Sequence, residues 1–218
     1  HPGSPAESGT YARSRGTTMK NNSPSMAADF CFTLPPWVHQ LVAETAGRKF
    51  TSDEEKMEWV LELGRRNIED GGGPFAAAIF SWDNGTLLTP GVNRVMACNC
   101  SILHAEICAI ILAQQQLSSY TLAPKEGTES KGYELITSTE PCAMCLGATP
   151  WAGIKRIVCG ARDADARGVG FDEGDKPERW VKKLQQRGIE VKRDTCRAAA
   201  VALLREYVDR SGEIYNGM

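Results

Sequence analysis

The chain has 218 residues, 42% of them hydrophobic, and its 25 Lys and Arg against 27 Asp and Glu give a formal net charge of -2. This length and composition suit one domain with a full core. No apolar run approaches the roughly 20 residues of a membrane helix, so we expect no membrane partner. The near-neutral balance weighs against a nucleic-acid partner, because such binding depends largely on Lys and Arg that neutralise phosphates.

The eight cysteines are not arranged like a disulfide framework. Cys142 and Cys145 have the spacing of metal ligands, and Cys108 and Cys159 lie in apolar runs typical of buried free thiols. The amino end also lacks the pattern of a secretory signal. We therefore expect a reducing compartment and a cytoplasmic protein.

A change of composition near residue 30 divides the chain. Residues 1–29 are rich in small and polar residues and show almost no apolar periodicity. They are predicted to be a disordered leader or a segment added for expression. Their Arg and Ser with few acids also fit the remnant of an organelle transit peptide, so organelle targeting stays open. The folded domain is predicted over residues 30–218.

The first half of this domain predicts two helices and a hairpin. A double proline precedes a short helix, and capping-box spacing followed by an apolar stripe predicts a longer one. Two apolar runs flank Asp83-Asn84-Gly85, a strong signal for a tight turn between antiparallel strands. The predicted elements are a helix ending at 47, a helix over 52–70, and strands over 75–82 and 86–95.

The second half alternates helices with strands, which predicts a parallel part of the sheet. The predicted elements are helices over 104–117, 142–151 and 198–208, a helix that begins at 177, and strands over 133–137, 154–160 and 189–192. Residues 118–132 fall outside this pattern and are predicted to be a surface insertion. The fold class is therefore α/β, as a three-layer α/β/α sandwich with a mixed five-stranded sheet.

Two short motifs hold the candidate metal ligands. His104-Ala105-Glu106 opens one predicted helix, and Pro141-Cys142-Ala143-Met144-Cys145 follows a predicted strand. One imidazole and two thiolates are three ligands of the kind that a catalytic zinc takes when water fills its fourth position. The start of a helix also favours the thiolate form of Cys142 and Cys145. We predict one Zn²⁺ per subunit on His104, Cys142 and Cys145.

Glu106 is the predicted proton carrier. It lies two residues past His104, so on a helix its side chain points away from the ligand direction and is free to move protons. His-x-Glu followed by Pro-Cys-x-x-Cys is the signature of zinc-dependent nucleobase deaminases. The predicted reaction is hydrolytic deamination with zinc-bound hydroxide as the nucleophile and Glu106 as the proton shuttle. The backbone amide of Ala105 is a candidate donor to the zinc-bound oxygen.

A zinc-stabilised binding module without catalysis is the alternative outside enzymes. A Cys-x-x-Cys pair alone is often half of a structural zinc site. Such a site needs a fourth ligand, and Cys98 and Cys100 lie too close to His104 in the sequence to form a matching half.

From Phe30 to its end, the chain resembles the cytidine deaminase superfamily and, within it, the bacterial-type guanine deaminases. The resemblance rests on the two zinc motifs and on four wider stretches, which are 72–76, 91–95, 140–145 and 170–174. It implies a cytidine deaminase-like fold, a role in guanine catabolism within purine metabolism, and a homodimer.

The resemblance also implies a purine site. In the family, an Asn at the position of Asn93, on the second strand, contacts the ring, and an acid at the position of Glu173 binds its amidine edge. Guanine presents N1–H and its 2-amino group side by side as donors, which suits a carboxylate, whereas adenine presents an acceptor at N1. Asp172 is the second candidate for this acid.

Aromatic residues complete the predicted site. Phe75, Phe171 and Trp151 are the candidates to flank a flat base, although each could instead be a packing residue. Tyr215 lies in a tail over 212–218, and related enzymes close their site with the carboxyl end. We predict Tyr215 to contact the substrate from such a lid.

The predicted function is deamination of guanine to xanthine and ammonia, with ammeline-like aminotriazines as further candidate substrates. The alternative enzyme is a tRNA adenosine deaminase of the same superfamily. That enzyme would need a basic face and no acid at the amidine edge of the base.

Overall fold

The computed structural model describes residues 30–217, and the predicted leader over 1–29 lies outside them. Residues 33–217 belong to one compact unit. Within the described residues, every helix is too short or too polar to cross a bilayer.

A mixed five-stranded sheet with the strand order β2-β1-β3-β4-β5 forms the centre of this unit, as predicted. The strands are β1 (Ala76–Ser81), β2 (Leu87–Val92), β3 (Tyr133–Thr139), β4 (Arg156–Ala161) and β5 (Glu190–Lys192). β1 is antiparallel to both β2 and β3, whereas β3, β4 and β5 are parallel. The carboxyl ends of β2, β3 and β4 therefore meet at one edge of the sheet, which is where open α/β sheets bind ligands.

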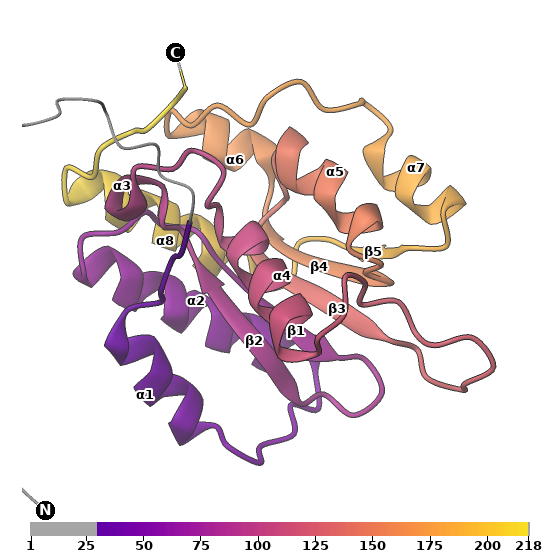
Figure 1. Cartoon of the computed structure of the whole chain (residues 1–218). Helices are drawn as coiled ribbons and strands as arrows, with labels where there is room; N and C mark the ends of the chain where they lie inside the picture. The colour runs from indigo at the N-terminus through magenta and orange to yellow at the C-terminus, as the bar shows by residue number, and fades with distance from the viewer. Residues whose placement is uncertain (1–29, 218) are drawn as a thin grey trace, which may run out of the picture. The chain divides into compact units, whose positions relative to one another are not determined.

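Helices cover both faces of the sheet, so the three-layer prediction is also confirmed (Figure 1). The helices are α1 (Pro36–Glu44), α2 (Asp53–Glu69), α3 (Val95–Cys98), α4 (Ala105–Gln116), α5 (Ala143–Trp151), α6 (Asp163–Gly168), α7 (Trp180–Gln186) and α8 (Arg197–Asp209). α4, α5 and α7 pack on one face around a core that includes Ile79, Leu135 and Ile157. α2 and α8 contact each other and the sheet on the other face.

Gly91 on β2 lets the start of α4 lie directly on the sheet. A β carbon at this position would lie 2.1 Å from the carbonyl oxygen of Ala105 and 2.6 Å from the amide nitrogen of Ala109. A larger residue would push away the helix turn that follows His104. The Thr89 hydroxyl, which donates to the carbonyl oxygen of Ala109 at 2.9 Å, holds the helix against the same strand.

Three details differ from the prediction. The second strand ends at Val92 rather than at Val95, because the chain turns at Asn93 into the short helix α3. The short helix α6 was also not predicted. The insertion over 118–132 has no helix or strand, but it is anchored by the buried Leu122, whose N–H donates to the carbonyl oxygen of Ala152 at 2.7 Å.

Candidate active site

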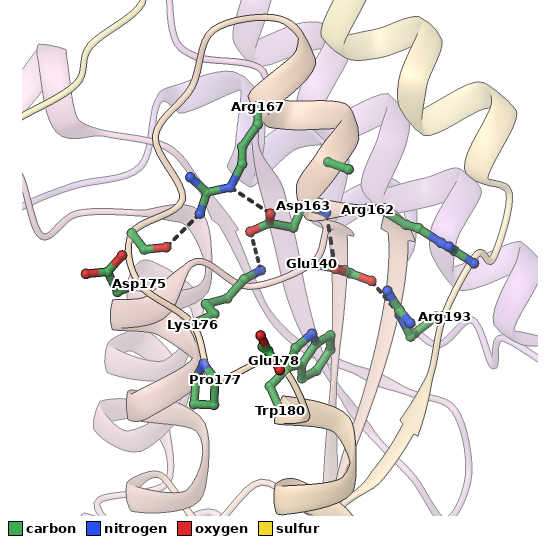
Figure 2. Close-up of a pocket in the computed structure, with 12 residues that line it drawn as sticks. Glu140, Arg162, Asp163, Arg167, Asp175, Lys176, Pro177, Glu178, Trp180 and Arg193 are labelled. Atoms are coloured by element: carbon green, nitrogen blue, oxygen red, sulfur yellow. Dashed lines mark hydrogen bonds and ion pairs between the residues drawn. The ribbon is translucent and has the colours of Figure 1, made fainter.

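Two cavities border Glu140 near the carboxyl ends of the strands. The larger, of about 520 Å³, is lined by four basic side chains, and each of them pairs with a carboxylate. Figure 2 shows the pairs of Arg167, Lys176 and Arg193. The smaller, of about 280 Å³, is lined by His104, Cys142 and Glu106. The predicted chemistry therefore belongs to the smaller cavity, which suits a small molecule rather than a polymer.

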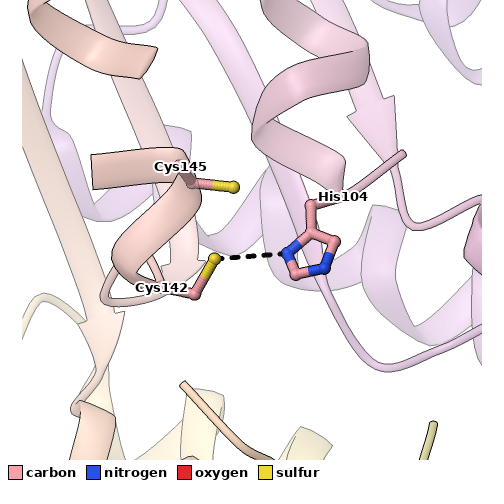
Figure 3. Close-up of side chains that lie close together, drawn as sticks. All are labelled: His104, Cys142 and Cys145. Atoms are coloured by element: carbon pink, nitrogen blue, oxygen red, sulfur yellow. Dashed lines mark hydrogen bonds between the residues drawn. The ribbon is translucent and has the colours of Figure 1, made fainter. Parts of the chain in front are cut away.

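His104, Cys142 and Cys145 come together as the sequence predicted (Figure 3). Their ligand atoms all lie within 4.8 Å of one another, and Nδ1 of His104 is 3.4 Å from Sγ of Cys142. His104 directly precedes α4 and Cys142 directly precedes α5, so the starts of two helices meet at this point. Unpaired backbone amides at a helix start favour negative charge on the sulfurs.

The chemistry of this donor set fits a zinc ion. The Cys145 thiol, with help from His104, lowers the pKa of Cys142 to about 4, while the same partnership raises the pKa of Cys145 well above its ordinary value. A cation between the two sulfurs would favour the thiolate form of both. Among residues 30–217 this cluster has only three members, which leaves a fourth position for water.

Glu106 lies beside the cluster on the first turn of α4 and is buried. Its Oε2 is 3.4 Å from Sγ of Cys145, and its Oε1 is 3.4 Å from the hydroxyl oxygen of Thr137. Burial raises the pKa of its carboxyl group. Ala105 is the first residue of α4, so its N–H is one of the donors that a helix leaves unpaired at its start.

Glu173 places a buried carboxylate in the same cavity. Glu173 is only 5% exposed and borders the cavity. Among the described residues, no side chain or backbone group forms a hydrogen bond or an ion pair with its carboxylate. Burial raises the pKa of this group to about 8. The backbone fixes its position, since the Glu173 carbonyl oxygen accepts from the N–H of Ala143 at 2.9 Å. The raised pKa favours the protonated form at neutral pH, and N–H donors of a bound ligand would favour the carboxylate that accepts from them.

Asp172, the second candidate, also borders the cavity, but its carboxylate already has partners. Its Oδ1 accepts from the N–H of Gly174 at 2.9 Å and lies 3.4 Å from Nη1 of Arg167. These contacts shape the loop that carries Glu173. The structure therefore favours Glu173 as the acid that meets a ligand.

Asn93 lies just past the end of β2 rather than on the strand. It is buried, and it is not one of the residues that line the cavity. Its side-chain oxygen accepts from the N–H of Val95 at 3.2 Å, which turns the chain out of the strand. Within residues 30–217 its Nδ2 has no partner. Contact between Asn93 and a purine stays a prediction.

Three of the four predicted aromatic residues form one wall of the cavity. The ring of Phe171 meets that of Phe75 edge to face at 4.8 Å and that of Tyr215 at 5.3 Å. The Tyr215 hydroxyl is buried and has no partner among the described residues. The tail thus brings Tyr215 to the cavity.

Trp151 does not lie at the cavity, contrary to our prediction. α5 continues through Pro150, and the side chain at its last residue is 87% exposed. Six residues of helix carry Trp151 roughly 9 Å along the axis beyond Cys145, away from the ligands.

Two polar residues that sequence reasoning missed hold predicted site residues in place. Thr137 contacts Glu106, as described above. Asn67 on α2 donates from Nδ2 to the carbonyl oxygen of Gly73 at 2.8 Å and lies 3.3 Å from that of Asn93. The position of Asn67 on the apolar stripe of α2 could have indicated a buried polar role, because a buried amide needs hydrogen-bond partners.

Residues 50–161, which are 112 of the 218 residues, match the cytidine and deoxycytidylate deaminase zinc-binding region. The chain belongs to this deaminase family. The structure of this chain is similar to that of a guanine deaminase from Nitrosomonas europaea, with a TM-score of 0.76 and 44% identity over 84% of this chain and 98% of that one. It is also similar to a variant of the protein NE0047 in complex with 8-azaguanine, with a TM-score of 0.78 and 44% identity over 86% of this chain and all of that one.

In sequence, this chain is 38% identical to the guanine deaminase of Bacillus subtilis (strain 168) over 112 residues. That match covers 49% of this chain and 65% of the relative, so the chain spans slightly less than two thirds of that curated protein.

The first prediction concerns the metal. Elemental analysis of the purified protein should find a divalent metal ion, and Cys142→Ser should lose most of it because one of three protein ligands is gone. Cys31→Ser, which changes an exposed cysteine outside the cluster, is the matched control and should keep the metal. Full metal content in Cys142→Ser would contradict the assignment of these ligands.

Proposed function

We propose that this protein hydrolyses guanine to xanthine and ammonia, with one Zn²⁺ per subunit on His104, Cys142 and Cys145. The observation that carries the proposal is the buried, unpaired carboxylate of Glu173 in the cavity of the metal cluster. The relatives that bind or deaminate guanine and its analogues support it.

The donor pattern of guanine suits this carboxylate. N1–H and the 2-amino group of guanine lie side by side as donors, and the two oxygens of Glu173 can accept from both. The rings of Phe75 and Phe171 offer apolar surface to a flat base. An adenine ring would instead place the acceptor N1 against the carboxylate, so the cavity does not support the tRNA adenosine alternative.

When bound at this donor set, zinc lowers the pKa of a water molecule to about 7, which makes a nucleophile available at neutral pH. The attacked atom is C2 of guanine, which bears the amino group. Glu173 orients that amino group, and the aromatic wall limits the position of the ring. The cavity thereby presents one ring carbon to the water beside Glu106.

Glu106 moves the protons. It accepts one proton from the attacking water and delivers it to the adjacent ring nitrogen, so that C2 becomes tetrahedral. The second proton of the water then passes through Glu106 to the amino nitrogen, the C–N bond breaks and ammonia leaves. Water supplies the new carbonyl oxygen and both protons, so the atoms balance.

Glu106→Gln tests the proton transfer. The amide cannot accept the proton of the water, so we expect turnover of guanine to fall at least about a hundredfold with fold and metal content retained. Ammonia release and elemental analysis on the same sample measure both quantities. Turnover close to that of the wild type would remove Glu106 from the mechanism.

Glu173→Gln tests base recognition. The amide offers one acceptor and presents donors to the donors of guanine, so kcat/KM should fall about 10- to 100-fold, as expected for the loss of a charged hydrogen bond. The melting temperature should change little because the carboxylate has no partner among the described residues. Glu178→Gln, the same change at an exposed residue outside this cavity, is the matched control, and assays with adenosine-containing tRNA and cytidine check the substrate class. Equal losses in both variants, or activity on the tRNA alone, would contradict the proposal.

We also propose a homodimer in the cytoplasm. Trp151 and Tyr120 are 87% and 89% exposed, and the Leu122–Ala152 hydrogen bond brings their segments together. Exposed aromatic residues on neighbouring segments are typical of protein interfaces. All eight cysteines are free, which suits a reducing cytoplasm.

Light scattering tests the dimer. Wild-type protein should have twice the mass of one chain, and Trp151→Glu should shift it toward the monomer because a charge would be buried at the contact. Val208→Glu, at an exposed apolar position on α8 across the sheet, should leave the mass unchanged. A wild-type monomer, or a dimer that persists in Trp151→Glu, would contradict this contact.

A further inference from the structure

Glu173 lies on a loop that one backbone hydrogen bond, from the N–H of Ala143 to the Glu173 carbonyl oxygen, ties to the start of α5, and side-chain links add to this bond. The segment between α6 and α7 has no helix or strand at Glu173, and a side chain on such a loop is less well fixed than one on a helix. Two cations hold the loop on either side of it. Nη2 of Arg167 donates to the carbonyl oxygen of Gly174 at 2.6 Å, and Nζ of Lys176 donates to the carbonyl oxygen of Pro141 at 3.0 Å.

One carboxylate joins these two cations (Figure 2). Oδ2 of Asp163 accepts from Nε of Arg167 at 2.7 Å, and its Oδ1 lies 2.7 Å from Nζ of Lys176. The Lys176 side chain is only 7% exposed, so it depends on this anion more than a surface lysine would. Burial alone would raise the pKa of Asp163, but Arg167 and Lys176 outweigh it and lower the pKa.

The start of α6 fixes Asp163 in turn. The backbone N–H of Asp163 donates to Oε2 of Glu140 at 3.1 Å, and the other oxygen of Glu140 accepts from Nε of Arg193. Glu140 directly precedes Pro141 and the metal-ligand turn. Asp163 is therefore linked both to the loop of Glu173 and to the chain that leads into Cys142.

We propose that Asp163 is a positioning residue for base recognition, which holds the Glu173 loop against the metal-ligand turn through Arg167 and Lys176. It acts through these residues, because Asp163 does not line the cavity that contains Glu173. The inference rests on the proposed deamination of guanine and assigns to the charged cavity of Figure 2 a supporting role beside the active site.

Asp163→Asn is the central test, with Asp165→Asn as the matched control. Asp165 lies on the same helix, and its carboxylate binds Arg197 on α8 and the N–H of Arg162, neither of which belongs to the Glu173 loop. The Asn side chain keeps an oxygen that can accept from the Arg162 N–H. We expect Asp163→Asn to lower kcat/KM for guanine about 10- to 100-fold, mainly through KM, as expected when a recognition group is displaced. Metal content should be retained, and Asp165→Asn should stay within about twofold of the wild type.

A double-mutant cycle separates positioning from general stability. If Asp163 acts through Glu173, Asp163→Asn should cost little further activity in a Glu173→Gln background. Losses that multiply would overturn the proposal. If Asp163→Asn fails to fold, Arg167→Met removes one of the two links at an exposed position and should give the same non-additivity with Glu173→Gln.

Hydrogen exchange provides a readout that does not depend on activity. Peptides that cover 169–176 should exchange faster in Asp163→Asn, but not in Asp165→Asn, because the loop loses its anchor. Unchanged exchange would overturn the positioning role even if activity fell. A wild-type protein that does not deaminate guanine would overturn both the proposed function and the role of Asp163 in base recognition. In that case the exchange experiment would test only whether Asp163 anchors the loop.

Discussion

The site depends on the meeting of two helix starts at one edge of the sheet. Gly91 lets α4 lie on β2, and the turn after β3 begins α5, so that an imidazole and two thiols lie within 4.8 Å of one another. The three side chains leave a fourth position for water at a metal ion. Glu106 follows from the same geometry, because the first turn of α4 brings it beside the sulfur of Cys145.

The sequence predicted the parts of this arrangement that depend on local patterns. The spacing of the two motifs predicted that His104, Cys142, Cys145 and Glu106 would come together, and the alternation of helices and strands predicted the mixed sheet. Asn93 was predicted to lie on a strand because the apolar pattern continues to Val95. The hydrogen bond from the Val95 N–H to the Asn93 side chain, which turns the chain, cannot be read from that pattern. Trp151 failed as a cavity residue because aromatic character does not reveal which way a helix end faces. The link from Lys176 to Pro141 joins residues too distant in sequence for spacing to reveal.

Two neighbouring acids illustrate how the fold assigns different tasks to similar residues. Asp172 is held by Arg167 and the Gly174 amide, whereas Glu173 is buried without a partner among the described residues. A buried carboxylate without donors is costly to maintain, and a ligand that brings two donors offsets that cost. In the proposed binding mode, the carboxylate that accepts from guanine would disfavour a base with an acceptor at that edge.

The most direct test is a crystal structure of the zinc-loaded protein with 8-azaguanine. The account predicts a zinc ion on His104, Cys142 and Cys145, with Glu173 accepting from N1–H and the amino group of the base and Glu106 beside the ring carbon that bears this amino group. A base bound away from Glu173, or a metal ion held by other residues, would contradict it.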